Sequence, residues 1–248
     1  MDDTSSVPPA RRKRRILGLD DQQRQGERRR LLLGAALELF GTRGYARTSI
    51  ELLCQTAGIG TNSFYELFPN KEAVMIGLYD QLAERFEQAV LHRYLEHRAE
   101  ADPIHPMVSA FVHEAVDDPR VARVAFIESA GISADVEEHR RRVRNTFIDG
   151  LQAIGSDIRQ AYDSVPDEQV RDRLGPGSRR NAVAVVGAIV EMTLDWLLDP
   201  EPDPIEDLID DIAHHCRRVV LTAIQEVSDQ QTTVQQTTDQ KATDQKPS

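Results

Sequence analysis

Cysteine, aromatic residues and long apolar runs are all scarce in this chain of 248 residues. The two cysteines, Cys54 and Cys216, fall in different predicted helices, so we expect two small buried thiols and no disulfide. No apolar run approaches the roughly 18 residues that a membrane span requires. Basic residues near the amino terminus have no apolar stretch behind them, so we do not expect a secretory signal. Together these absences predict a cytoplasmic protein.

The sequence also lacks the motifs of catalysis, nucleotide binding and metal binding. It has neither a serine elbow nor a P-loop, and the GxG at Gly58–Gly60 has no strand before it. His214, His215 and Cys216 are neighbours in sequence, and adjacent helix positions do not converge on one ion. We therefore predict no enzymatic activity, no cofactor and no metal site.

Strand-like alternation of apolar and polar residues is missing as well, whereas apolar residues recur at helical spacing along most of the chain. We therefore predict an all-α fold. A family resemblance, given below, implies a three-helix domain with a helix-turn-helix over residues 26–86 and a second helical domain over residues 87–228. Residues 1–22 and 229–248 are predicted to be disordered because they are polar or charged.

One short stretch carries the most specific signal in the chain. Thr48 and Glu51 have the spacing of a capping box, which predicts a helix that begins there and ends at Gly58. A short second helix is predicted over Thr61–Leu67. Two helices joined by such a turn, here within residues 49–68, are typical of a helix-turn-helix, which lays its second helix in the major groove of DNA. The alternative is an ordinary helical hairpin whose polar face meets water.

Polar side chains remain on the outer face of the second helix once Phe64 and Phe68 are assigned to the core. These side chains are short or flat, uncharged and able to form hydrogen bonds, which suits contacts with phosphates and base edges. They are Thr61, Asn62, Ser63 and Tyr65.

Several positions around this segment agree, in order and spacing, with one protein family. They are Phe40, Gly44-Tyr45, Thr48-Ser49-Ile50, Ala57-Gly58-Ile59, Phe64-Tyr65, Phe68 and Lys71-Glu72. On these residues the chain resembles the TetR-type transcriptional regulators. The resemblance implies a homodimer with an N-terminal DNA-binding domain and a C-terminal helical domain for ligand binding and dimerisation. It also implies that Thr48 and Ser49 lie near the DNA phosphates, that Lys71 contacts a phosphate, and that a small molecule releases the DNA.

Three positions depart from the family pattern. Gly60 replaces the usual serine or threonine cap, so the start of the second helix is weaker. Leu67 replaces a usual histidine or tyrosine, which removes one polar contact. Glu51 stands where some relatives place a basic or polar residue. It either completes the helix cap, which we favour, or accepts a hydrogen bond from a cytosine amine.

Positive charge is concentrated at the amino-terminal end. Residues 1–75 hold twelve Lys and Arg against nine Asp and Glu, a net charge of +3, whereas the whole chain carries −11, so the remainder carries −14. A DNA-binding protein needs basic charge only where it faces phosphate. One basic run is either an arm that contacts DNA or a solvated tail without a specific contact. It consists of Arg11, Arg12, Lys13, Arg14 and Arg15.

Two strongly apolar helices are predicted near the carboxyl end, at residues 178–198 and 204–227. Their apolar faces are wider than one small domain can cover, so we expect them to pair with a second copy of the chain, as the resemblance also implies. The alternative is that both helices pack wholly within one chain. The residues assigned to the interface are Val183, Val186, Val190, Ile212, Cys216 and Val220.

The ligand pocket is only weakly specified. Its candidate residues are aromatic side chains of the second domain and one acidic residue in an apolar stretch, namely Phe111, Phe126, Phe147, Trp196 and Glu128. The alternatives are that the aromatic residues belong to the core and that Glu128 faces water. The charged run at residues 137–144 would attract an anionic effector. We favour instead a solvated face held by i,i+4 pairs, Glu137 with Arg141 and Glu138 with Arg142.

These features predict a sequence-specific DNA-binding transcriptional regulator, a repressor that a small-molecule effector releases from a palindromic operator. Two recognition helices would read half-sites about one helical turn, ~34–36 Å, apart. The alternative is a helical small-molecule sensor or carrier with weakened or lost DNA binding, which only Gly60 and Leu67 support. A helical enzyme is a third alternative, for which no paired acid and base are visible.

Overall fold

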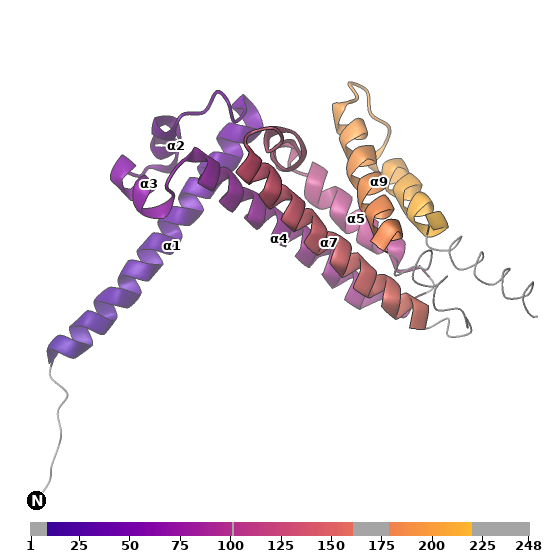
Figure 1. The fold of residues 1–248 in the computed structure, drawn as a ribbon, viewed down its shortest axis with the longest axis horizontal. Helices are drawn as coiled ribbons and strands as arrows, with labels where there is room; N and C mark the ends of the chain where they lie inside the picture. The colour runs from indigo at the N-terminus through magenta and orange to yellow at the C-terminus, as the bar shows by residue number, and fades with distance from the viewer. Residues whose placement is uncertain (1–8, 101, 161–178, 220–248) are drawn as a thin grey trace, which may run out of the picture.

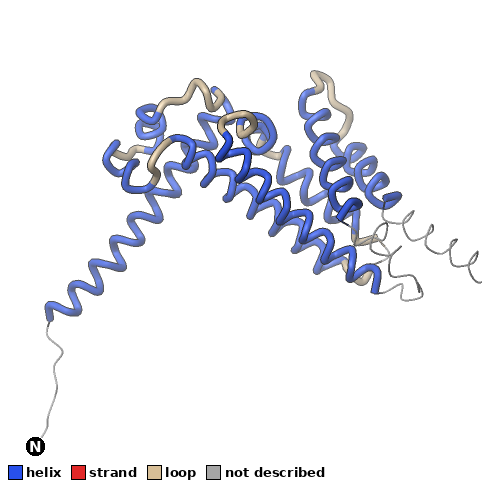
Figure 2. The backbone as a smooth tube through the Cα atoms, in the orientation of Figure 1, coloured by secondary structure: helices blue, strands red, loops and turns tan. Residues whose placement is uncertain are grey.

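The fold is helical throughout the part of the chain that a computed structural model describes, residues 9–100, 102–160 and 179–219 (Figures 1 and 2). No strand occurs within these ranges, and the predicted all-α fold is confirmed. The elements are α1 (Pro9–Arg43), α2 (Ile50–Ala57), α3 (Thr61–Leu67), α4 (Lys71–His97), α5 (Ile104–Val116), α6 (Pro119–Ala122), the π-helix η1 (Arg123–Glu128), α7 (Ala134–Gln160), α9 (Arg179–Leu198) and a further helix over residues 205–219.

Helices α1 to α4 enclose one apolar core. Leu32, Ala36 and Phe40 recur at helical spacing along one side of α1 and are fully buried. They pack in the same cluster as Leu53 of α2 and Phe64 of α3, which are also fully buried. Figure 1 shows α2 and α3 against the second half of α1, while the first half of α1 projects away from the molecule.

Helix α1 begins at Pro9, so residues 9–22 are helical, contrary to the expected disorder. Proline suits the first turn of a helix because its missing N–H has no intrahelical acceptor there. The residues that follow are rich in Arg, Leu and Gln, which are strong helix formers. Local propensity is therefore sufficient to extend the helix beyond the part that packs on the core.

Local caps set the bounds of the two short helices. The Ser49 hydroxyl accepts a hydrogen bond of 3.2 Å from the N–H of Leu52, which makes Ser49 the N-cap of α2. At the other end Gly58 has a φ of 66°, in the left-handed region where glycine is least strained. Helix α3 then spans Thr61–Leu67, as predicted, after Gly60, which provides no side-chain cap.

Helix α4 connects the amino-terminal domain to the body. It begins after Asn70, whose side chain accepts a hydrogen bond of 2.8 Å from the N–H of Ala73. Its buried residues run from Val74 to Phe86 and Tyr94, and α4 continues beside α5 and α7 (Figure 1). One continuous element therefore joins the helix-turn-helix to the second domain.

The segment between α5 and α7 is more irregular than predicted. The sequence favours a single helix from Asp118 to Gly131, whereas the structure has the short α6 followed by the π-helical η1. Val121 and Val124 of this segment are fully buried in the core that contains α1. The segment therefore belongs to the body in sequence and packs against the amino-terminal domain. π-Helical turns are rare and are frequent at functional sites.

A second core holds the carboxyl-terminal helices to α5. Val108 and Val112 of α5 are buried with Leu208, Ile209 and Ile212 of the helix at 205–219. Helix α9 packs on this cluster through partly buried side chains such as Ile189 and Met192. This arrangement leaves a space between α9 and the pair formed by α4 and α7, and side chains from all of these helices reach into it.

Candidate DNA-binding surface and effector cavity

The outer face of α3 presents polar side chains to solvent. Thr61 and Asn62 are exposed, Tyr65 is 57% exposed, and Ser63 is half-buried. Phe64 on the opposite side is fully buried and meets the Tyr65 ring edge-on, with 5.3 Å between the ring centroids. The core therefore fixes which side of α3 faces outward, and that side carries the four residues predicted from sequence.

Thr48 is not available to DNA. Its hydroxyl donates a hydrogen bond of 2.9 Å to the carbonyl of Gly44, and the residue is only 2% exposed. Its predicted phosphate contact is therefore wrong, and so is the capping box at Thr48, because the exposed Ser49 caps α2. Hydrogen bonds from its own backbone N–H and from Ser49 lower the pKa of Glu51. Glu51 lies in the first turn of α2, two residues after that N-cap. The choice between a cap role and a contact with DNA stays a prediction.

Lys71 points into the protein. Its Nζ donates to the carbonyls of Tyr45 and Thr48, each at 2.9 Å, and lies 4.0 Å from the centroid of the Tyr45 ring. Burial lowers the pKa of Lys71 and raises the pKa of Tyr45 to about 12. These contacts tie the start of α4 to the loop before α2. Two of the three ammonium donors are already used, so a phosphate contact would have only the third.

One exposed basic residue was missed by the sequence reasoning. Arg47 lies in the loop directly before the N-cap Ser49, and it forms no hydrogen bond or ion pair with the residues that the structure describes. The signal for it was a basic residue two positions before the N-cap of α2. The basic run at residues 11–15 lies near the start of α1, and its DNA contact remains a prediction.

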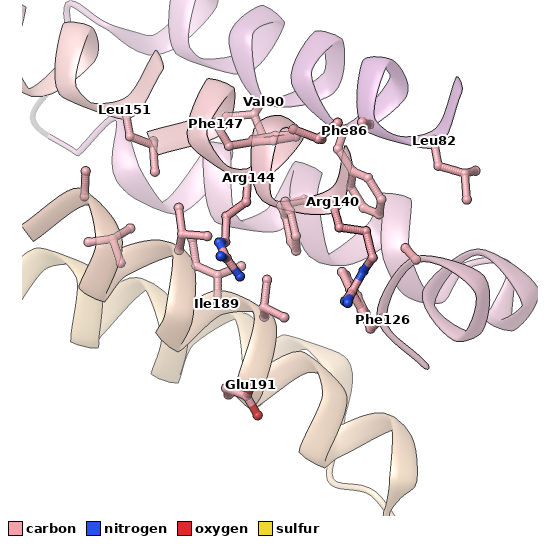
Figure 3. Close-up of a pocket in the computed structure, with 18 of the residues that line it drawn as sticks. Leu82, Phe86, Val90, Phe126, Arg140, Arg144, Phe147, Leu151, Ile189 and Glu191 are labelled. Carbon is pink, nitrogen blue, oxygen red and sulfur yellow. The ribbon is translucent and has the colours of Figure 1, made fainter. Parts of the chain in front are cut away.

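A cavity of about 660 Å³ lies in the body between α4, α5, η1, α7 and α9 (Figure 3). This volume is within the range of small-molecule sites, and the wall is mostly apolar, as such sites usually are. Apolar side chains come from every one of these helices, including Leu82, Phe86, Val90, Met107, Phe111, Ala125, Phe126, Phe147, Leu151, Val186, Ile189 and Val190.

Three of the five predicted ligand residues line this cavity, namely Phe111, Phe126 and Phe147. The prediction is wrong for Trp196, whose indole N–H donates to the carbonyl of Asp203 at 2.8 Å and whose ring packs on the second core. It is also wrong for Glu128. The helical spacing of the aromatic residues predicts the helices on which they lie. It does not show which side of each helix faces a cavity.

Glu128 joins the body to the amino-terminal domain. Its Oε2 accepts a hydrogen bond of 2.8 Å from the N–H of Tyr45, and its Oε1 accepts two from Arg123, at 3.1 and 3.2 Å. Gly44 has a φ of 91°, and a Cβ there would lie 3.1 Å from the Glu128 carboxylate. Glycine is therefore required at this position both for the backbone conformation and for the close approach.

The charged run on α7 also differs from the prediction. Arg140 pairs with Glu137 at 3.0 Å and Arg141 with Glu138 at 2.5 Å, so the pairs are i,i+3 and not the predicted i,i+4. The same run faces the cavity instead of lying wholly in solvent, because Arg140, Arg141 and Arg144 all line the cavity. In Figure 3 the guanidinium groups of Arg140 and Arg144 point from α7 into this space.

A sequence signal for these arginines existed. Arg140 and Arg144 lie seven and three residues before Phe147, and they continue the face of α7 that carries Phe147 and Leu151. Three and four residues are the spacings that place side chains on one side of a helix. The side of α7 that lines the cavity could therefore be found in the sequence as an apolar helical face that becomes basic at one end.

Known proteins share both the domain and the fold. Residues 32–78 match the tetR family of bacterial regulatory proteins. Over 169 residues the chain is 26% identical to the transcriptional regulator EthR of Mycolicibacterium smegmatis, covering 64% of this chain and 75% of that one. Over 194 residues it is 28% identical to the transcriptional regulator TtgR of Pseudomonas putida, covering 75% of this chain and 86% of that one. The chain is a TetR-type regulator.

The solved structures agree with this assignment at the level of the fold. The structure of FadR from Bacillus subtilis in complex with stearoyl-CoA has a TM-score of 0.62 to this TetR-type regulator, at 17% identity, and the match covers 77% of this chain and 96% of that one. This likeness shows the same fold, a helix-turn-helix domain followed by a helical body.

In this TetR-type regulator, part of the apolar surface of α9 is exposed. By length and composition alone, α9 is apolar enough to cross a membrane, contrary to the expectation from the sequence. Within its most apolar stretch, 11% of the residues are buried. Val183 is 47% exposed on α9, and Gly187, one turn further, is also exposed. Val186 and Val190 line the cavity instead. The surface of α9 that is free to meet a second chain is therefore narrower than predicted.

Two further residues assigned to the interface are buried inside the chain. Ile212 and Cys216 belong to the second core, so their assignment is wrong. Helical periodicity identifies an apolar face but does not show what covers it. Val220 lies outside the described residues.

Both cysteines are buried free thiols, as predicted from the sequence. Burial raises the pKa of the Cys216 thiol to about 11.

Proposed function

We propose that this protein is a homodimeric repressor that binds a palindromic operator through α3 and leaves it when a small molecule enters the body. One observation supports the proposal. The same chain has an exposed polar face on α3 and a largely apolar cavity, and the continuous helix α4 connects the two. A repressor of this kind works in the cytoplasm, beside its DNA.

The DNA contacts are assigned to the outward side of α3 and to the loop before α2. Thr61, Asn62, Ser63 and Tyr65 supply hydrogen-bonding groups for base edges and phosphates. The exposed Ser49 and Arg47 lie at the start of α2 and supply phosphate contacts. The basic residues 11–15 in α1 add an arm that reaches the DNA backbone.

The effector acts through two elements that touch both the cavity and the amino-terminal domain. Helix α4 lines the cavity with Leu82 and Phe86 and begins at Lys71, which holds the loop before α2. The π-helix η1 lines the cavity with Phe126 and ends at Glu128, which is bonded to the same loop. A ligand that displaces either wall moves the helix-turn-helix. A change of a few ångströms in the half-site spacing of ~34–36 Å loses contacts on one half-site.

The second chain is assigned to the open face of α9. Val183 and Gly187 lie on that face. Apart from its chain neighbours and the nearby backbone of α9, no atom lies within 4 Å of a Cβ built at Gly187. An apolar helix that is so little buried within its own chain is best covered by its counterpart in a twofold dimer. Two copies of α3 are then available for the two halves of a palindrome.

A carrier that has lost DNA binding is less well supported. Leu67 packs partly on the first core, and α3 forms a regular helix after Gly60. Neither departure from the family pattern therefore damages the surface that would read DNA.

Selection of bound fragments from genomic DNA by the purified protein, followed by gel-shift titration of the enriched site, tests the proposal. We expect a palindrome whose affinity falls steeply as salt rises. Tyr65→Ala should weaken binding by about 1–3 kcal/mol and leave the dimer intact. Leu91→Ala is the matched control, because Leu91 is 45% exposed but lies on α4. The absence of an enriched palindrome, or full affinity in Tyr65→Ala, would contradict the proposal.

A further inference from the structure

One side of the cavity is basic, and its charge is only partly neutralised. Arg140, Arg141 and Arg144 of α7 line it. Arg140 is paired with Glu137 and Arg141 with Glu138. Arg144 forms no hydrogen bond or ion pair with the residues that the structure describes. Its charge helps to lower the pKa of Glu137 from a distance, but no carboxylate of these residues contacts it directly.

The opposite wall does not supply that partner. The remaining acidic side chain among the described lining residues is Glu191 of α9. Figure 3 shows its carboxylate turned away from Arg140 and Arg144, and no ion pair joins it to either. The positive charge of Arg144 is thus not neutralised by direct contact with an acidic side chain of the cavity wall.

Arg140 also retains an unused donor. One of its terminal nitrogens bonds to both carboxylate oxygens of Glu137, at 3.0 and 3.1 Å, whereas its Nε is buried and has no hydrogen-bond partner among the described residues. A buried donor without an acceptor is unfavourable, so an acceptor oxygen brought by a ligand would be favoured at this position. Guanidinium groups prefer carboxylate or phosphate oxygens, which they bind with parallel hydrogen bonds.

The cavity changes from basic to apolar along α7. Phe147, Leu151 and Ile154 follow Arg144 on the same face of the helix, and all of them line the cavity. At 1.5 Å per residue the distance along the helix from Arg144 to Ile154 is roughly 15 Å. Val186 and Val190 of α9 contribute to the apolar wall. The shape suits a molecule with a charged end and an extended apolar part.

We infer that the effector is an amphiphile with an anionic head group bound by Arg144 and Arg140 and an apolar tail lying along α7 toward Ile154. The inference rests on the proposed function, because it names the chemistry of the molecule that the cavity receives. The head group lies on the part of α7 that is nearer its start, and the same cavity is lined by Phe126 of η1. Binding therefore reaches the element that ends at Glu128.

Isothermal titration calorimetry on the full chain tests the inference with four probes that share one tail. Dodecanoate and dodecyl phosphate are anionic, methyl dodecanoate is neutral, and dodecyltrimethylammonium is cationic. We expect at least one of the two anions to bind at least about tenfold more tightly than the ester, which corresponds to about 1.4 kcal/mol. We expect the cation to bind more weakly than the ester. Comparing the two anions distinguishes a carboxylate from a phosphate head group.

Variants of α7 then locate the head group. Arg144→Gln should remove the preference for the anion and leave the affinity for the ester unchanged. Arg142→Gln is the matched control, since Arg142 is exposed on the same helix and does not line the cavity. Thermal unfolding of each variant shows whether it is folded. The comparison of anion with ester in the wild-type protein does not depend on any variant.

The inference is overturned if neither anion binds more tightly than the ester, or if Arg144→Gln keeps the preference. Gel shifts on the selected operator separate this failure from failure of the proposed function. Operator binding without a preference for anions overturns the ligand assignment alone. A preference for anions without operator binding supports the ligand assignment and refutes the repressor.

Discussion

The backbone N–H of Tyr45 donates a hydrogen bond of 2.8 Å to the carboxylate of Glu128, across 83 positions of sequence. Tyr45 belongs to the loop that Lys71 holds in place before α2. Glu128 ends the π-helix whose Phe126 lines the cavity. This bond therefore lies between the space that would hold an effector and the helices that would hold DNA.

Removal of the Glu128 carboxylate should destabilise the contact between the domains. We expect Glu128→Ala to lower the free energy of unfolding by about 1–3 kcal/mol, because the Tyr45 N–H loses its acceptor in a partly buried position. Glu128→Gln keeps an oxygen acceptor and should lose less. Urea denaturation of the three proteins measures the difference. Equal stability of Glu128→Ala and the wild type would show that the bond contributes nothing.

Substitution of Lys71 should lower both stability and DNA affinity, whereas substitution of Arg47 should lower DNA affinity alone. Lys71→Met keeps most of the side-chain volume but leaves the carbonyls of Tyr45 and Thr48 without their donor, so it should lower stability as well as DNA affinity. Arg47→Ala should weaken DNA binding, reduce its salt dependence and leave stability unchanged. Thermal unfolding beside gel-shift titration separates the two. A Lys71→Met protein with wild-type stability would refute the structural role.

The helix-turn-helix was predictable because its signals are local. Helical spacing of Leu53, Cys54 and Ala57, a glycine at position 58 and the alternation of Phe64 with polar neighbours fixed two helices and their outer faces. The cap was misplaced by one residue. Thr48 and Ser49 are chemically similar, and the choice between them depends on the bond from the Thr48 hydroxyl to Gly44, which is a tertiary feature of the folded loop.

Residues whose role depends on distant partners were not predictable in the same way. Glu128 interrupts an apolar stretch, which is the pattern of a pocket residue as well as of a contact between domains. Ile212 lies on an apolar stripe, and a stripe has the same appearance whether its own chain or a second copy covers it. Arg140 and Arg144 were placed in solvent because the sequence showed acidic partners for other arginines of the run and did not show the cavity.

The buried thiol of Cys216 should be slow to react. Burial raises its pKa to about 11 from an ordinary value of 9.0, so at pH 8 the native thiol is almost entirely protonated, whereas the unfolded one is partly ionised. Because the thiolate is the reactive form, a disulfide reagent should modify Cys216 in Cys54→Ala protein much faster in urea than in native buffer. The difference should narrow as the pH rises toward 11. Rapid modification of the native protein at pH 8 would contradict its burial.

Two substitutions near the carboxyl end should separate dimerisation from folding. Gly187→Arg adds a long side chain at a position that is open in the single chain, and arginine favours helix over glycine by nearly 1 kcal/mol. It should therefore yield a folded monomer that does not bind a palindrome. Ile212→Ala creates a cavity in the second core and should cost about 2–5 kcal/mol of stability. Sedimentation velocity and circular dichroism report the two effects separately. A Gly187→Arg protein that sediments as a dimer would show that the open face of α9 is not where the chains meet.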